Sequence, residues 1–168
     1  MKYTDITNAI DNLDRILRQR DSFIRRTADS LLERLKSADY GFPADEVCLQ
    51  AIASPIEDSR SYHSVELPTD DADGRRGFRV RFVKTYNGYL RGVVSLAKWV
   101  FSVEGDEIVA QISGESECFR APLNGPPSSA FIDMLAVATA RQIHSGMLQM
   151  SQDPSVRKTM GFHSLTQS

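Results

Sequence analysis

The sequence predicts an α+β fold in a single domain of residues 1–168, with helices covering one face of an antiparallel sheet. Three observations support this prediction. Apolar residues recur at helical spacing over residues 1–40, alternate with polar residues over residues 77–121, and return to helical spacing over residues 128–151. The length of 168 residues and the composition, 41% hydrophobic and 25% charged, suit one globular domain that needs neither disulfides nor a structural metal.

Residues 1–40 are predicted to form a helical arm. Its apolar residues follow spacings of three, four or seven, as one face of a helix requires: Ile6, Ile10, Leu13, Leu17, Ile24, Leu31 and Leu35. Gly41 and Pro43 then end the helix. Because this face is longer than a small sheet readily covers, two alternatives remain open: a helical hairpin that breaks near Asp21-Ser22, or contact with a second copy of the chain. The self-association residues would be Leu13, Leu17, Ile24 and Leu31.

Residues 42–76 give the weakest local signals. Pro43 and the acidic residues after it favour a short helix to about Ala53, since proline suits the first helical position and acidic residues suit a helix N-terminus. We expect an edge strand from Ile56 to Leu67, followed by an acidic polar loop over Pro68–Gly77.

Residues 77–121 are predicted to form a meander of about four antiparallel strands. In the first strand Phe78, Val80 and Phe82 share one face. Arg79 and Arg81 must then lie on the other face, where we expect them to reach solvent or a partner. Asn87-Gly88 is typical of a type I′ hairpin turn. The later strands are expected within residues 93–103, 108–112 and 118–119.

Residues 128–151 are predicted to form the last helix, packed on one face of the sheet. Pro126 and Pro127 end the preceding strand, and Ser128 or Ser129 can cap the helix. Apolar residues from Ile132 onward follow helical spacing, so this helix is expected to bury one face.

Charged residues are segregated along the chain. From Arg75 to Val103 there are seven basic residues and no acidic one, whereas residues 44–73 hold eight acidic residues and one basic residue. The net charge of −2 therefore conceals a basic hairpin beside acidic segments. Two interpretations remain open: the acidic segments neutralise the hairpin within the same chain, or the hairpin binds an anionic partner.

The second interpretation defines a set of candidate partner- or anion-binding residues: Arg75, Arg76, Arg79, Arg81, Lys84 and Arg91. An acidic protein is the favoured partner, because charge complementarity sets specificity and association rate. Nucleic acid is the alternative, since aromatic residues near the hairpin could stack on bases.

Motifs of catalysis or cofactor binding are missing from the sequence, including nucleophile elbows, zinc-protease helices, phosphate-binding loops and dinucleotide fingerprints. We therefore expect no enzymatic activity, no cofactor and no metal. The sequence leads to a non-enzymatic protein-binding module, such as an adaptor, a small chaperone or a stoichiometric inhibitor. An enzyme with an unfamiliar site, built from Cys48 with His63 or His144 and a carboxylate, is a further alternative.

The expected setting is a cytoplasmic homodimer. Neither a secretory signal nor an apolar run long enough to cross a membrane is found, so no membrane contact is expected. The two cysteines, Cys48 and Cys118, are too few for a disulfide scaffold or a four-cysteine zinc site.

Overall fold

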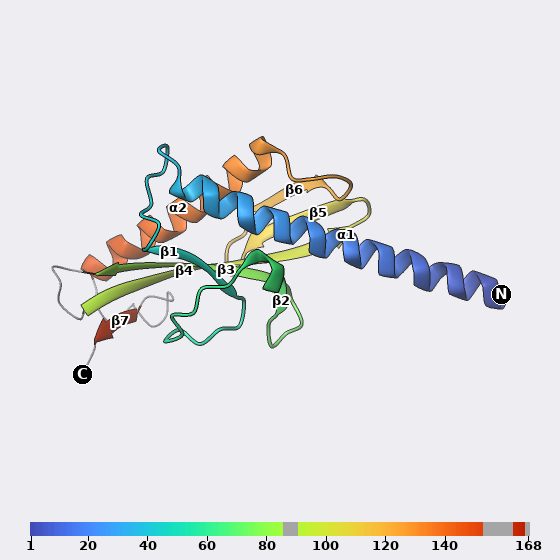
Figure 1. The fold of residues 1–168 in the computed structure, drawn as a ribbon, viewed down its shortest axis with the longest axis horizontal. Coiled ribbons are helices and arrows are strands. Elements are labelled where there is room, and N and C mark those ends of the chain that lie inside the picture. Colours follow the sequence, from blue (N-terminus) through green and yellow to red (C-terminus); the bar gives the residue numbers. More distant parts are fainter. Residues whose placement is uncertain (86–90, 153–162, 167–168) are drawn as a thin grey trace.

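The fold was determined as a computed structural model that describes residues 1–85, 91–152 and 163–166, with side chains for residues 1–84 and 94–148. It is α+β, with one long N-terminal helix, an antiparallel sheet and a C-terminal helix (Figure 1). The elements in chain order are α1 (Tyr3–Lys36), β1 (Val47–Ala51), the 3-10 turn η1 (Ser64–Glu66), β2 (Thr69–Asp70), β3 (Arg76–Thr85), β4 (Arg91–Glu104), β5 (Glu107–Ile112), β6 (Cys118–Pro122), α2 (Ser129–Gln152) and β7 (His163–Thr166).

The sheet has the strand order β1-β3-β4-β5-β6, and every neighbouring pair is antiparallel. The predicted meander is therefore confirmed as β3 to β6. The short strand β2 pairs with β3, and β7 pairs with β4. The turn predicted at Asn87-Gly88 lies outside the described residues.

The segment after α1 differs from its prediction. Residues 47–51 form strand β1 and not a helix, because Val47, Leu49 and Ala51 pair with Phe82, Val80 and Phe78 of β3 and share the core face with them. The helix-start signal at Pro43 is local, and long-range pairing with β3 overrides it.

The edge strand predicted from Ile56 to Leu67 is also wrong. This segment is a loop that carries η1, and β1 occupies the edge of the sheet in its place. The loop runs beside β1, where the Gln50 amide donates to the carbonyl oxygens of Asp58 and Arg60. The backbone N–H of Tyr62 also donates to the carbonyl oxygen of Leu49 at 2.8 Å, so a side chain and the backbone of β1 both hold the loop.

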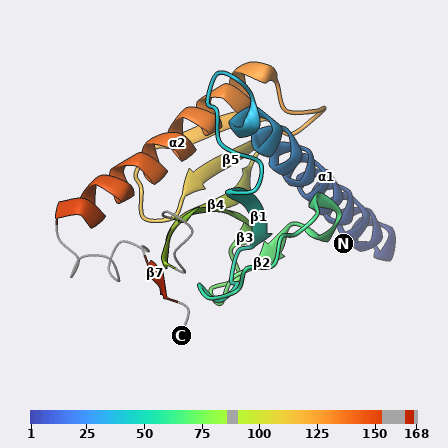
Figure 2. The same cartoon turned by 60° about the vertical axis from the view of Figure 1, so that its left-hand side comes forward.

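Both helices cover the same face of the sheet (Figure 2). The rings of Phe23 on α1 and Phe131 on α2 meet edge to face at 5.6 Å, above a core that includes Phe78 and Trp99 of the sheet. Ser128 caps α2, as predicted, since its hydroxyl accepts the N–H of Phe131 at 3.1 Å. No helix in the described part of the chain is long and apolar enough to span a membrane.

Helix α1 runs unbroken from Tyr3 to Lys36, so the helical hairpin broken near Asp21-Ser22 is excluded. Its buried residues begin at Phe23 and continue to Leu35. The N-terminal half extends past the sheet and past α2 (Figure 1).

Candidate functional site

The N-terminal half of α1 is the first candidate surface. We call residues 3–19 the helix extension. Five of its apolar side chains are 38% to 83% exposed and lie at spacings of three and four residues: Tyr3, Ile6, Ile10, Leu13 and Leu17. Such spacing aligns them on one side of the helix, as in the seam of a coiled coil. Ile16, near the base of the extension, is partly buried and packs against the core. The extension therefore carries an apolar stripe that its own chain leaves exposed.

The stripe continues the line of residues that α1 buries in the core. Ile24 and Leu31 follow Ile10 and Leu17 at steps of seven and are completely buried in the core of the same chain. Ile24 and Leu31 are thus unavailable for self-association, contrary to the expectation from sequence. Leu13 and Leu17 lie on the extension and remain exposed.

Polar contacts between residues of the extension stabilise its helical conformation and involve no other part of the chain. Arg18 forms an ion pair with Asp14 at 2.8 Å, one turn away, and Arg15 donates to Asn12 at 2.6 Å. Exposed pairs of this kind contribute only a few tenths of a kcal/mol each. The larger contribution comes from the core-packed half of α1, which supplies a formed helix that the extension only has to continue.

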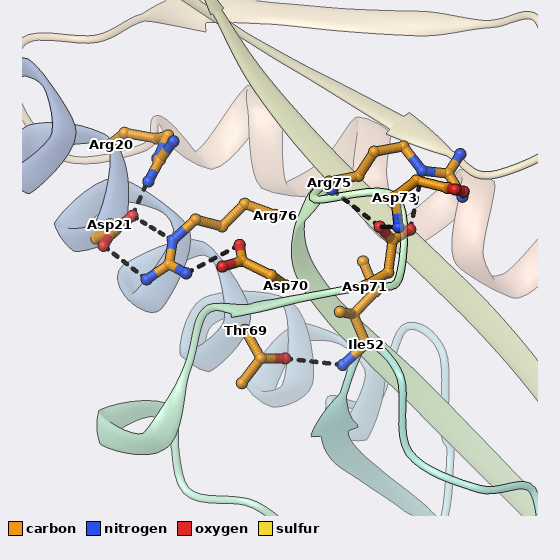
Figure 3. Close-up of polar contacts among 9 residues, drawn as sticks. All are labelled: Arg20, Asp21, Ile52, Thr69, Asp70, Asp71, Asp73, Arg75 and Arg76. Carbon is orange, nitrogen blue, oxygen red and sulfur yellow. Dashed lines mark hydrogen bonds and ion pairs between the residues drawn. The ribbon is translucent and has the colours of Figure 1, made fainter.

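The extension is anchored where it meets the body by a carboxylate shared between two arginines (Figure 3). Asp21 accepts two hydrogen bonds from Arg76 of β3, both at 2.9 Å, and one from Arg20 at 3.0 Å. Partial burial alone would raise the pKa of the Asp21 carboxyl, but the hydrogen bonds from Arg76 and Arg20 hold it below its usual value. A charged contact with the sheet therefore anchors α1 at the point where the extension begins.

A groove of ≈ 460 Å³ runs beside the base of the extension, against the loop that follows β6. Its lining includes the buried apolar residues Phe23 and Leu123 and the charged residues Asp14, Arg18 and Arg26. A concave surface of mixed charge thus lies alongside the second half of the extension.

The basic strands were the second candidate surface, and most of their cations are bound by acidic residues of the same chain. Arg76 also pairs with Asp70 at 3.0 Å, and Lys84 pairs with Glu46 at 3.1 Å. Arg75 lies against two carboxylates of the acidic loop, Asp71 and Asp73 (Figure 3).

Asp71 is the centre of this neutralisation. Its side chain is almost fully buried and binds Arg75 at 2.8 Å and Lys98 at 3.0 Å. Burial would raise the pKa of the Asp71 carboxyl, but hydrogen bonds from Lys98 and from the backbone and side chain of Arg75 hold it far below its usual range. The acidic loop therefore neutralises positive charge that would otherwise be available to an anionic partner.

Arg79 and Arg81 lie opposite the core face of β3, as predicted, but they do not reach solvent. Their exposed fractions are only 5% and 6%. The loop after β1 covers this face, since Arg79 donates to the carbonyl oxygens of Ser54 and Pro55. The side chain of Arg91 lies outside the described residues. The basic residues therefore do not form the continuous exposed surface that an acidic protein or a nucleic acid would need.

Cys48 and His63, considered from sequence as a thiol and base, line one cavity together with Glu46. No hydrogen bond between Cys48 and His63 is found among the described side chains, and the Glu46 carboxylate is bound to Lys84. His144 is exposed on α2, away from this cavity. Within the described ranges, no group of three or more His, Cys, Asp or Glu residues is placed to hold a metal ion.

Sequence reasoning found the apolar stripe but missed which part of it is exposed. The spacing alone identifies Ile6, Ile10 and Ile24 as members of one apolar face. Which of them is exposed depends on where the rest of the chain packs along α1.

Comparison of the chain with protein-family models, with curated proteins and with solved structures finds no match.

Proposed function

We propose that this protein is a non-enzymatic protein-binding module that acts as a homodimer, with the helix extension as the contact between the two copies. The observation that carries the proposal is the exposed apolar stripe from Tyr3 to Leu17. It lies on the N-terminal half of α1, which extends past the sheet (Figure 1). Apolar side chains of this size lose free energy when they leave water, which favours a partner for the stripe.

The spacing of the stripe favours a second copy as that partner. Ile6, Ile10, Leu13 and Leu17 are separated by four, three and four residues, a series that reads the same in both directions. In an antiparallel pair of extensions, Ile6 then lies opposite Leu17 of the second copy, and Ile10 lies opposite Leu13. This contact is self-complementary, as a two-fold symmetric interface must be.

The length of the extension is sufficient for such a pair. Its seventeen residues (3–19) span roughly 25 Å at the rise of an α-helix. Four apolar layers fit within this length, with each side chain inserting between residues of the facing helix. The core-packed half of α1 preforms each helix, which reduces the entropy lost on pairing.

Sedimentation at micromolar concentration tests the proposal. The wild type is expected to sediment as a dimer. Leu13→Asp and Leu17→Asp should each weaken self-association by at least about 100-fold, because a carboxylate would be buried in the seam without a partner.

Val65→Asp is the matched control, because Val65 is 74% exposed on η1 and lies outside the extension. This variant should remain dimeric with the same affinity. A wild type that is monomeric throughout the concentration range would contradict the proposal, as would Leu13→Asp and Leu17→Asp variants that dimerise normally.

A further inference from the structure

A cavity of ≈ 340 Å³ lies beside the outer edge of β1, at the end of β3 that is remote from the helix extension. We call it the Arg81 pocket. It is lined by β1 and β3, by the end of α1, by residues 44–46 before β1 and by the loop that precedes η1. Its charged lining residues are Lys36, Asp45, Glu46 and Arg81, and Ser59 and Ser61 add two hydroxyl groups.

Arg81 is buried in this pocket without a partner for its inner nitrogen. The side chain is 94% buried, and its Nε atom has no hydrogen-bond acceptor. No carboxylate in the described part of the chain forms an ion pair with it, in contrast to Arg75, Arg76, Lys84 and Lys98. A guanidinium remains charged at all physiological pH values, so this burial is unfavourable unless an anion binds there.

Arg79 adds a second positive charge to the same face of β3. Its nitrogens donate to neutral acceptors only, namely Gln50 Oε1 at 3.2 Å, the Ser54 carbonyl at 2.7 Å and the Pro55 carbonyl at 3.3 Å. The guanidinium of Arg79 is therefore hydrogen-bonded, but no bound carboxylate neutralises its charge.

The two cations influence each other. Burial lowers the pKa of Arg79, and the neighbouring charge of Arg81 lowers it further, while Asp58 acts in the opposite sense without forming an ion pair. Glu46, at the rim, is already bound to Lys84. Asp45 also lines the cavity, but among the described residues it forms no ion pair with either arginine. Arg79 and Arg81 are thus left without a bound carboxylate at this point of the fold.

We propose that the Arg81 pocket binds a small molecule through a carboxylate or phosphate group, with Arg81 as the principal ligand of that oxyanion. The two terminal nitrogens of a guanidinium form a fork that matches two oxygens of such a group. The hydroxyl groups of Ser59 and Ser61 line the same cavity and can donate further hydrogen bonds.

The volume of the pocket restricts the ligand to a small molecule, because ≈ 340 Å³ is near the lower end of the range for small-molecule sites. The pocket shares no lining residue with the helix extension. Ligand binding in the Arg81 pocket therefore does not depend on dimerisation.

Titration of the arginine side-chain Nε–H resonances by NMR tests the inference. Inorganic phosphate and acetate are the two probes, and sodium chloride at matched ionic strength is the reference. We expect a saturable shift of the Arg81 resonance with at least one probe, and the stronger of the two identifies the oxyanion. The resonance of Arg120, an exposed arginine on the same sheet face, should follow the chloride reference. Shifts of Arg81 that match those in chloride would overturn the proposal.

Thermal unfolding gives a second measurement, with Arg81→Gln as the variant and Arg120→Gln as its matched control. In the wild type and in Arg120→Gln, the effective probe should raise Tm by about 5–10 °C at a hundredfold excess over Kd. Arg81→Gln should lose this rise and should have an equal or higher Tm without the probe, because the uncompensated cation has been removed. A lower Tm without the probe together with an unchanged rise would overturn the proposal. If Arg81→Gln fails to fold, the wild-type titration alone decides.

Discussion

The indole N–H of Trp99, on β4, donates a hydrogen bond of 3.0 Å to the hydroxyl oxygen of Thr139, on α2. Both side chains are completely buried. The Thr139 hydroxyl in turn donates to the carbonyl oxygen of Leu135 at 2.7 Å, so the polar groups of this contact are satisfied inside the apolar core. The contact fixes the position of α2 along the sheet, because a shift of one residue would leave the indole N–H without an acceptor.

Thr139→Val should lower the free energy of unfolding by about 1–3 kcal/mol, since it leaves the buried Trp99 N–H unsatisfied. Thr27→Val is the matched control. Thr27 is equally buried in a helix, but its hydroxyl has no hydrogen-bond partner, so valine should leave the stability unchanged or raise it by up to about 1 kcal/mol. Urea unfolding at neutral pH measures both variants. Equal losses of unfolding free energy in the two variants would show that packing, and not the hydrogen bond to Trp99, accounts for the effect of Thr139→Val.

Gly77→Ala should destabilise the protein by about 3 kcal/mol or more, because a Cβ atom on residue 77 would lie 1.9 Å from the carbonyl oxygen of Trp99. The pairing of Gly77 with Val100 holds the two strands too close for that atom. Gly114→Ala, at a φ of +93° in open space, should cost only about 1 kcal/mol of backbone strain. Urea unfolding of the two variants compares these costs, and a Gly77→Ala protein as stable as Gly114→Ala would contradict the close approach of β3 and β4.

Stability should fall on acidification as Asp71 becomes protonated. Its pKa in the folded protein lies far below the value of 3.8 expected when the chain is unfolded. A lowered carboxyl pKa contributes stability that is complete above the unfolded-state value and is lost as the pH falls from there toward the folded-state value. The urea midpoint of the wild type should therefore decrease between about pH 5 and pH 2.

Asp71→Asn removes this titration and isolates its effect. The variant should be less stable than the wild type at pH 7, because Arg75 and Lys98 lose their shared carboxylate. Its midpoint should fall less on acidification, so the two curves should converge at low pH. Parallel curves would show that Asp71 is not the group responsible. Asp73→Asn, in the same loop but largely exposed, should cost less stability at pH 7.

The helices and the β-meander could be predicted from sequence because their signals are local. Apolar periodicity in α1 and α2, and alternation through Phe78, Val80 and Phe82, depend only on neighbours along the chain. Strand β1 could not be predicted in this way. Val47 and Leu49 become a strand because they pair with β3, and no signal within residues 42–53 outweighs the helix-start pattern at Pro43.

The distribution of charged residues along the chain could be predicted, but not which of them form pairs or become buried in the fold. The sequence places acidic residues beside the basic strands, and the pairing of Asp71 with Arg75 lies within four residues. The pairing of Arg76 with Asp21 spans 55 residues and depends on how α1 crosses the sheet. The burial of Arg79 and Arg81 likewise depends on a loop that is hydrogen-bonded to Leu49, Gln50 and Arg79, contacts for which the sequence has no local pattern.

The position of Arg76 between Asp21 on α1 and Asp70 on β2 also limits how this sequence can evolve. Asp70 and Arg76 are six residues apart, whereas Asp21 precedes Arg76 by 55 residues, and the three side chains meet at one guanidinium. A lineage that replaces the arginine leaves Asp70 without its ion-pair partner and Asp21 with Arg20 alone, and one that replaces Asp21 first weakens the attachment of the helix. Substitutions at positions 21, 70 and 76 should therefore be accepted together, and related sequences should show these three positions varying in concert.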